Sequence, residues 1–318
     1  MTTFDLAVGD AGRSLQGRTM LVTGGASGFG EAIVASLFRA AKDIAVIIAD
    51  VNEENGLQVE RKLVADCRKA KFVQVDLTSW PSVVGLFRAA LRWLQTEHEV
   101  GTIDHVFGIA GVSGEGFDPT SVSPTDFLNS DELPKTPSTL SNQVSVLGNT
   151  YLTQAAIKYG MGLHEHPTQV NKSITLMGSL ASYVAIPLGC DYSASKWGVR
   201  GLFKSLLDAT EVEALPFRVN LIAPYYVKTP LTAHRVAALE SAGVQFGEVV
   251  DVAAAATRLC ADRTVHGRAI GIWKGGAFDL CDDWEGGFGS RALQQGRASG
   301  MLMAPQTQVW RARVDGAQ

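Results

Sequence analysis

Cysteine is scarce in this chain and follows no spacing that would hold a metal or a disulfide framework. Among 318 residues there are four cysteines, with no Cys-x-x-Cys pair and no cluster of cysteine and histidine. Structural zinc sites and disulfide-rich domains depend on such spacings, so no metal site is expected and a reducing compartment is favoured. The four residues are Cys67, Cys190, Cys260 and Cys281.

Long apolar runs and an excess of either charge are also missing. No stretch of about 18 apolar residues is present to cross a membrane, and residues 1–14 lack the apolar run of a secretory signal. The formal net charge is −4, which suggests neither nucleic acid nor an anionic membrane as a partner. With 46% hydrophobic residues, the chain is expected to be a soluble cytoplasmic protein with a well-buried core.

Short apolar runs alternate with amphipathic stretches in the first part of the chain. Residues 20–22 lead into the glycine-rich run 23–30, and a helical pattern follows over residues 31–41. Residues 44–49 are almost continuously apolar, which is typical of a strand buried on both faces of a parallel sheet. Further strands and helices are predicted at 53–69, 72–75, 79–97 and 103–109. The alternation predicts an α/β fold with a doubly wound parallel sheet.

One domain is predicted for residues 17–281, between an N-terminal tail (1–16) and a C-terminal extension (282–318). Residues 112–141 are rich in Ser, Thr, Pro and acidic residues, and they are predicted to form a surface insertion. Residues 231–250 are predicted as a helical excursion. The other predicted elements are helices at 139–160, 191–213 and 252–261 and strands at 173–177, 218–222 and 268–273.

The glycine-rich run has the properties of a phosphate-binding turn. Glycines let the backbone turn tightly and let a pyrophosphate approach the first N–H groups of the following helix. The spacing is Gly-x-x-x-Gly-x-Gly, which differs from the Gly-x-Gly-x-x-Gly of other dinucleotide-binding folds. Alternatively, the glycines could serve turn geometry alone. The expected cofactor contacts are Gly24, Ser27, Gly28, Phe29 and Gly30.

Two aspartates that follow predicted strands are candidates for binding the adenosine half of a dinucleotide. Asp50 would accept hydrogen bonds from the ribose hydroxyls and repel a 2′-phosphate, and neither Ser27 nor Val51 supplies a cation, so NAD is predicted over NADP. Asp76, followed by Leu77, would bind the adenine side. For each aspartate the alternative is a cap on the next helix.

Tyr192 and Lys196 form the most informative pair in the chain. They lie four residues apart, so both side chains emerge on one face of the predicted helix. A nearby cation favours the phenolate and is expected to lower the pKa of the tyrosine, which makes it useful as an acid or base. Ser179, thirteen residues before Tyr192, could add a fixed donor for a reacting oxygen.

In order and spacing these motifs resemble the short-chain dehydrogenase/reductase family, over roughly residues 17–275. The resemblance implies a single Rossmann-type domain and transfer of a hydride between nicotinamide and a carbonyl or alcohol. It implies that Tyr192 is the general acid/base, that Lys196 lowers its pKa and binds the nicotinamide ribose, and that Ser179 binds the substrate oxygen. The matching residues are Thr23 to Gly30, Asp50, Asp76, Ala110, Gly111, Ser179, Tyr192, Lys196 and Asn220 to Thr229.

The chain departs from the family pattern at three places. The usual Asn-Asn-Ala-Gly is Gly-Ile-Ala-Gly over residues 108–111, and the usual Pro-Gly is Pro-Tyr over residues 224–225. The family's helix asparagine, whose backbone carbonyl holds a water linked to the lysine, aligns with Ser145. Asn142, one turn earlier, is the alternative match. Val227 and Thr229 still match positions that contact the carboxamide.

By resemblance, the substrate pocket is built after Gly111, after Ser179 and in a lid over residues 229–250. The expected lining is apolar and aromatic, so a small hydrophobic secondary alcohol or ketone is predicted as the substrate. A narrower resemblance is to fungal secondary-metabolism members and to the 15-hydroxyprostaglandin dehydrogenase-like branch. The predicted lining residues are Val112, Tyr183, Ile186, Tyr225, Tyr226 and Leu231. Family members commonly form homodimers or homotetramers through the helices that hold Tyr151 and Lys204.

Three functions remain open at the level of sequence. The first is an NAD-dependent oxidoreductase acting on a secondary alcohol or its ketone. The second is an enzyme of the same fold that catalyses a cyclisation, elimination or isomerisation, because a fold does not determine a reaction. The third is a non-catalytic dinucleotide sensor, which the set of Ser179, Tyr192 and Lys196 disfavours because a sensor needs no proton transfer.

Overall fold

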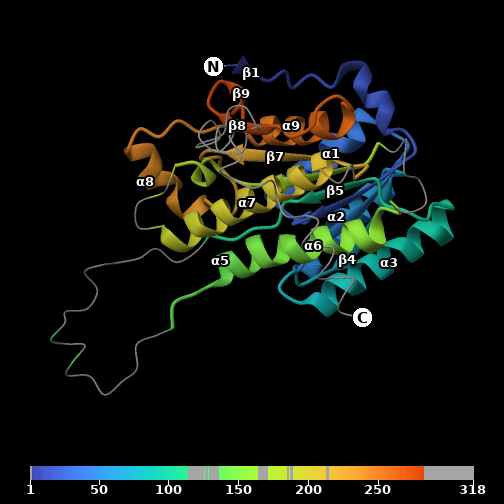
Figure 1. Cartoon of the computed structure of the whole chain (residues 1–318), viewed down its shortest axis with the longest axis horizontal. Coiled ribbons are helices and arrows are strands. Elements are labelled where there is room, and N and C mark those ends of the chain that lie inside the picture. The colour runs from blue at the N-terminus through green and yellow to red at the C-terminus, as the bar shows by residue number, and fades with distance from the viewer. Residues whose placement is uncertain are drawn as a thin grey trace, which may run out of the picture.

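A nine-stranded sheet organises the described part of the chain (Figure 1). The computed structural model describes residues 2–113, 125, 128, 136–163, 171–184, 186, 189–212 and 215–282. The strand order is β1-β9-β8-β7-β6-β5-β2-β3-β4, in which β2 to β8 are parallel and β1 and β9 antiparallel to their neighbours. The strands are β1 (Thr2–Thr3), β2 (Arg18–Thr23), β3 (Ile44–Asp50), β4 (Lys69–Gln74), β5 (His105–Gly108), β6 (Ser173–Met177), β7 (Arg218–Pro224), β8 (Ala269–Trp273) and β9 (Gly276–Asp279).

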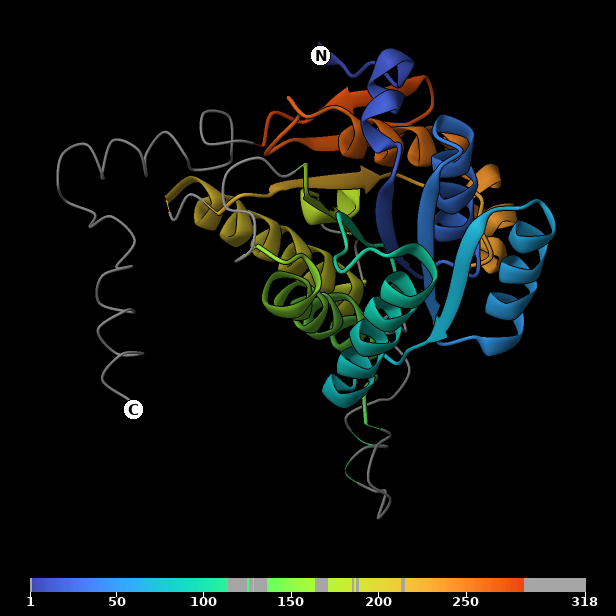
Figure 2. The ribbon, with the colours of Figure 1, turned by 90° about the vertical axis from the view of Figure 1, so that its right-hand side faces the viewer.

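Helices cover both faces of this sheet, as the doubly wound prediction requires (Figure 2). One layer holds α1 (Gly28–Ala40), α2 (Glu53–Ala65) and α9 (Val249–Ala261), which pack on one apolar cluster. The other holds α3 (Trp80–His98), α6 (Asn149–Ala155) and α7 (Cys190–Val212), which pack on a second cluster. Because it lies between the two layers, β3 is buried over residues 44–49, and the near-continuous apolar run there is explained.

The region predicted as one helix over 139–160 is a helical run with two wide turns. It consists of α5 (Leu140–Asn142), the π-helix η2 (Gln143–Gly148), α6 and a second π-helix, η3 (Ala156–Gly160). The side-chain amide of Asn149 donates to the carbonyl of Ser145 at 2.7 Å inside this run. Such π segments are frequent at functional sites, and periodicity alone does not distinguish them from an α-helix.

The N-terminal tail, the excursion and the segment after β6 each contain short elements. The N-terminal tail contains β1 and a 3₁₀ helix, η1 (Gly9–Leu15), whose Leu15 side chain is fully buried. The predicted excursion over residues 231–250 contains η5 (Ala233–Arg235) and the short helix α8 (Val236–Ser241). Elsewhere, a 3₁₀ turn, η4 (Leu180–Ser182), follows β6. Most of the predicted insertion and residues 283–318 lie outside the described residues. No helix in the described part of the chain is long and apolar enough to cross a membrane.

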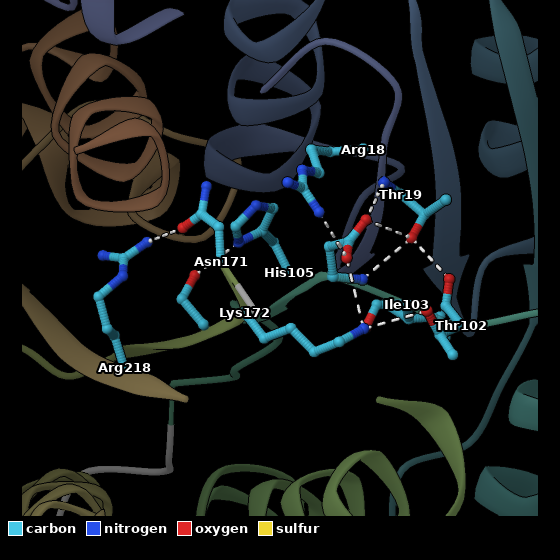
Figure 3. Close-up of polar contacts among 10 residues, drawn as sticks. Arg18, Thr19, Thr102, Ile103, His105, Asn171, Lys172 and Arg218 are labelled. Atoms are coloured by element: carbon cyan, nitrogen blue, oxygen red, sulfur yellow. Dashed lines mark hydrogen bonds and ion pairs between the residues drawn. The ribbon is translucent and has the colours of Figure 1, made fainter. Parts of the chain in front are cut away.

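A buried polar cluster lies at the amino ends of the central strands (Figure 3). The Lys172 ammonium lies 3.3 Å from the carboxylate of Asp104, and these side chains are 2% and 9% exposed. Asp104 also accepts a hydrogen bond from the backbone N–H of Thr19 at 3.0 Å. Beside this pair, His105 is fully buried and its Nδ1 lies 2.8 Å from the hydroxyl of Ser173.

The buried His105 is expected to make the protein sensitive to mild acid. Burial, followed by the positive charge of Arg218, holds its pKa well below 6.5, so the folded state keeps the ring neutral while the unfolded chain binds a proton. The contribution of this pKa difference to the free energy of unfolding is fully present above the unfolded pKa of about 6.5. It is lost as the pH falls below that value, at up to about 1.4 kcal/mol per pH unit. Urea denaturation between about pH 7.5 and about pH 5 measures this slope.

The variant His105→Gln is the control for that measurement, because glutamine cannot take up a proton. In this variant the free energy of unfolding is expected to change less with pH in the range between the folded and unfolded pKa values of the histidine. An unchanged slope in this variant would assign the acid sensitivity to other groups.

Candidate active site

A cavity of about 530 Å³ opens at the carboxyl ends of the central strands. Parallel sheets of this type bind ligands at that edge. The cavity is lined by the predicted cofactor residues Gly24, Ser27, Gly28, Phe29, Gly30, Asp50, Val51, Asp76, Leu77, Ala110, Gly111, Val227 and Thr229. It is also lined by Ser179, Tyr192 and Lys196. The fold therefore gathers into one cavity residues that are spread over more than 200 positions of the sequence.

The glycine turn between β2 and α1 is shaped so that only glycine fits. Gly24 and Gly28 have φ values of 66° and 53°, which lie in the left-handed region. A Cβ atom on Gly30 would lie 2.0 Å from the carbonyl oxygen of Gly24. The turn thus brings the N-terminus of α1 against the cavity, and this cradle fits the pyrophosphate of a dinucleotide.

Asp50 does not cap the helix that follows it. The cap of α2 is Asn52, which accepts from the backbone N–H of Asn55 at 3.0 Å. The Asp50 carboxylate instead accepts from the N–H of Ala26, in the glycine turn, at 3.1 Å, and from the N–H of Asn52 at 3.0 Å. Its position at the turn, on the cavity wall, fits the ribose contact that the sequence predicts.

Asp76 does not cap the helix that follows it, although its carboxylate contacts the turn before that helix. Its carboxylate accepts from the N–H of Thr78 at 2.9 Å and from the Thr78 hydroxyl at 2.7 Å, so it shapes the turn before α3. Ser79 is the cap of that helix. The Asp76 side chain is exposed at the cavity, next to Leu77, and this arrangement leaves it open to a ligand.

Ser179, Tyr192 and Lys196 come together from β6 and α7. Ser179 follows β6, and its hydroxyl accepts from the N–H of Ala181 at 3.1 Å and donates to the carbonyl of Pro224 at 3.3 Å. Tyr192 and Lys196 lie in the first turns of α7, with the ammonium 5.7 Å from the centre of the tyrosine ring. The ammonium donates to the carbonyl of Met177 at 3.0 Å. This serine, phenol and ammonium can together bind an oxygen and move its proton.

Burial dominates the titration of this pair. It lowers the pKa of Lys196 to about 8, so the ammonium remains mostly protonated at neutral pH. Burial also raises the pKa of Tyr192, and a hydrogen bond with Ser179 opposes the rise. The sequence predicts the opposite direction for Tyr192. The difference arises because desolvation of the phenolate outweighs the favourable groups around it.

Ser145 and Asn142 occupy different environments. Ser145 is fully buried in η2, and its hydroxyl has no hydrogen-bond partner among the described residues. A Cβ atom on Gly111 would lie 3.4 Å from the Lys196 ammonium and 3.7 Å from the Ser145 hydroxyl, so both groups flank this glycine. The amide of Asn142 instead reaches the carbonyl of Asp191, at 3.5 Å. Ser145 therefore lies near Gly111 and the Lys196 ammonium, whereas Asn142 contacts the start of α7.

The structure divides the predicted substrate residues into two groups. Val112, Tyr225 and Leu231 line the cavity, whereas Tyr183, Ile186 and Tyr226 are not among its lining residues. Tyr226 packs edge-on against Tyr225, with 4.7 Å between ring centres. The Tyr183 hydroxyl donates to Asp282 at 2.7 Å. Proximity in sequence to Ser179 therefore does not place Tyr183 and Ile186 on the cavity wall.

The cavity also contains apolar residues that sequence reasoning missed. Leu140 and Val144 line it from the helical run before α6, and Pro230 lines it from the excursion. The four-residue spacing of Leu140 and Val144 places them on one face of that run, which is a signal that the sequence contains. The described residues include no cluster of His, Cys, Asp or Glu that could hold a metal ion.

Comparisons with known proteins identify the family and the fold of this chain. The 5'-hydroxyaverantin dehydrogenase of Dothistroma septosporum is 32% identical over 92% of this chain and 94% of its own length. The NADP-dependent dehydrogenase M3 of a Phoma species is 31% identical over 85% of this chain and 80% of its own length. The crystal structure of levodione reductase covers 82% of this chain and 98% of its own with a TM-score of 0.65, at 21% identity, and so shows the fold. The family model described as short chain dehydrogenase matches residues 18–240. The chain therefore belongs to the short-chain dehydrogenase family.

Proposed function

We propose that this protein is an NAD-dependent oxidoreductase that interconverts a hydrophobic secondary alcohol and its ketone, with Tyr192 as the general acid/base. One observation supports this above the others: Ser179, Tyr192 and Lys196 line the same cavity as the glycine turn and Asp50. Oxidoreductase activity with a nicotinamide dinucleotide follows from membership of the family. The preference for NAD, the role of each residue and the substrate are our proposal.

The side chains divide the proton chemistry between them. The Ser179 hydroxyl binds the substrate oxygen, and Tyr192 accepts the proton of that oxygen as a phenolate in oxidation and donates it as a phenol in reduction. The dinucleotide supplies the acceptor or donor of the hydride when it is bound. Lys196 carries a positive charge 5.7 Å from the centre of the tyrosine ring, and this charge favours the phenolate, which is the form that accepts the proton in oxidation. Ser145, which lies close to Gly111 as Lys196 does, is the residue proposed to act behind the lysine.

The cavity wall indicates an apolar substrate. Val112, Leu140, Val144 and Leu231 surround the space, and among the described residues that line it Lys196 is the one Lys or Arg side chain. An anionic substrate would find no further cation there. The relative from Dothistroma septosporum is named as a dehydrogenase of a hydroxy compound, and an alcohol substrate for this chain agrees with that name.

Absorbance of the reduced nicotinamide during turnover tests the proposal. The probes are a series of secondary alcohols that runs from aliphatic butan-2-ol to bicyclic α-tetralol, each with NAD and with NADP. The proposal is supported if the absorbance of reduced nicotinamide rises during turnover and if its rate of rise is greater for the larger, more hydrophobic alcohols of the series. Product formed without a change in absorbance would indicate the non-redox reaction, and NAD binding without any product would indicate a sensor.

Asp50 is expected to determine the choice between NAD and NADP. Its carboxylate lies at the glycine turn, where a 2′-phosphate would meet its charge. In the variant Asp50→Ala the ratio of kcat/KM for NAD to that for NADP is expected to fall about tenfold, because one close repulsion of this kind is worth about 1.4 kcal/mol. Steady-state kinetics with each dinucleotide measures the ratio.

The variant Asp50→Asn separates charge from shape in that experiment. Asparagine keeps an oxygen that can accept the N–H of Ala26 but removes the negative charge. It is expected to shift the ratio in the same direction as alanine does. If neither variant changes the ratio, the cofactor preference does not depend on Asp50.

A further inference from the structure

Asp282 is almost fully buried although it is the last described residue, outside the domain that the sequence predicts. Its side chain is 2% exposed. The Arg200 guanidinium binds both carboxylate oxygens, at 2.7 and 2.8 Å, and the Tyr183 hydroxyl donates to one of them at 2.7 Å. Lys204 donates to the backbone carbonyl of Asp282. Two-pronged arginine–carboxylate pairs of this kind are strong and geometrically specific.

This carboxylate joins two segments that carry the proposed catalytic residues. Arg200 lies on α7, one helical turn after Lys196 and two turns after Tyr192. Tyr183 is the last residue of the short turn that begins at Ser179. Its N–H donates to the carbonyl of Leu180 at 2.9 Å, which closes this turn. The Arg200 guanidinium also lies over the Tyr183 ring, 4.4 Å from its centre. Asp282 therefore connects the Ser179 turn to the helix of Tyr192 and Lys196.

A second connection between the same two segments lies nearer the cavity. The Ser182 hydroxyl donates to the carbonyl of Lys196 at 2.8 Å and accepts from the N–H of Ser179 at 3.2 Å. Ser182 and Tyr183 are adjacent, and Lys196 and Arg200 are separated by one turn of α7. The turn is thus attached to the helix at two points, of which the outer one depends on Asp282.

We propose that Asp282 is a positioning residue, which holds the turn 179–183 against α7 so that the Ser179 and Tyr192 hydroxyls meet the same substrate oxygen. This inference rests on the function proposed above for Ser179 and Tyr192. Small displacements of a donor from the reacting atom reduce rates steeply, so a clamp between these segments has a catalytic consequence. Burial alone would raise the pKa of Asp282, but hydrogen bonds from Arg200 and Tyr183 keep this pKa below its usual value. The Asp282 carboxylate is therefore charged at neutral pH.

The opposing hypothesis is that Asp282 only fastens the end of the domain to α7. The variant Tyr183→Phe separates the two hypotheses, because it removes the hydrogen bond between the turn and Asp282 while the Arg200–Asp282 pair and the contact of Arg200 with the ring remain. Amide hydrogen exchange of residues 179–184, followed by mass spectrometry with NAD present, reports on the turn without any turnover. The kinetic readout is kcat and KM with α-tetralol.

If Asp282 positions the turn, exchange in residues 179–184 of Tyr183→Phe becomes about tenfold faster, as expected for loss of a local restraint. In the same variant kcat falls about tenfold while the KM for NAD is unchanged. Asp282→Asn shows the same pattern, because a neutral amide weakens the bonds from Arg200 and Tyr183, and the double variant falls little below either single variant, because both substitutions act on one connection. Tyr151→Phe, which removes a hydroxyl from a half-buried ring packed on Trp80, is the matched control and behaves like the unchanged protein.

Two results would overturn the inference. If Tyr183→Phe matches the unchanged protein while Asp282→Asn is impaired, Asp282 is only a fastening for the end of the domain. If neither variant changes exchange in residues 179–184, there is no clamp. Failure of the proposed function is distinguishable from both, because α-tetralol would then not be oxidised by the unchanged protein while hydrogen exchange would still report on the turn.

Discussion

Replacing Tyr192 with phenylalanine is expected to remove most of the redox activity and to leave NAD binding almost intact. The phenol is the group proposed to accept the proton of the alcohol, and loss of a general base costs about a hundredfold to ten-thousandfold in rate. Phenylalanine preserves the ring among its neighbours and removes only the hydroxyl that bonds Ser179. The measurement is kcat/KM from the absorbance of reduced nicotinamide, together with the affinity for NAD from the fluorescence of the protein.

The matched control is Tyr159→Phe, which removes a hydroxyl from a tyrosine that is 56% exposed. It should retain full activity. Activity that survives in Tyr192→Phe would show that another group accepts the proton. Simultaneous loss of NAD binding would show that the phenol contributes to the cofactor site more than to proton transfer.

Replacing Asp104 with asparagine is expected to cost the fold about 3 kcal/mol, because it leaves the buried ammonium of Lys172 without its carboxylate. The remaining acceptors of that ammonium include the Thr102 hydroxyl at 3.0 Å and the carbonyl of Ile103 at 3.3 Å. These neutral groups do not balance a charge that is removed from water. Urea denaturation at pH 7 measures the free energy of unfolding.

Two further variants show whether the loss comes from a buried charge. The double variant Asp104→Asn/Lys172→Met is expected to recover part of the stability, since it also removes the buried ammonium that has lost the Asp104 carboxylate. The surface pair of Asp43 and Lys69, 63% and 49% exposed, is the control, and Asp43→Asn should cost less than about 1 kcal/mol. Equal losses in Asp104→Asn and Asp43→Asn would contradict the importance of burial.

Local pattern was sufficient for the fold and for much of the site. The apolar run of residues 44–49 predicted a buried strand because every position of that strand faces one of the two helical layers. The glycine turn was predictable because its backbone admits no side chain at Gly30. The motif residues could be grouped in advance because the carboxyl ends of parallel strands lie at one edge of the sheet.

Features that depend on burial and on distant contacts could not be predicted in the same way. The pKa of Tyr192 is raised because of desolvation by residues from several elements, which the four-residue spacing to Lys196 does not report. The wide turns around Ser145 have the same periodic sequence pattern as an ordinary helix. Tyr183 follows Ser179 closely in sequence, yet its hydroxyl binds a residue 99 positions away and lies outside the cavity lining.

The sequence by itself determined the doubly wound fold, the family and the motif residues that line the cavity, because strand burial, glycine geometry and motif spacing are local properties of the chain. The tertiary structure alone decided which of those residues face the cavity, how burial changes their protonation, and that Asp282 connects the Ser179 turn to α7. These properties depend on desolvation and on contacts between segments far apart in the sequence, and both exist only once the chain has folded.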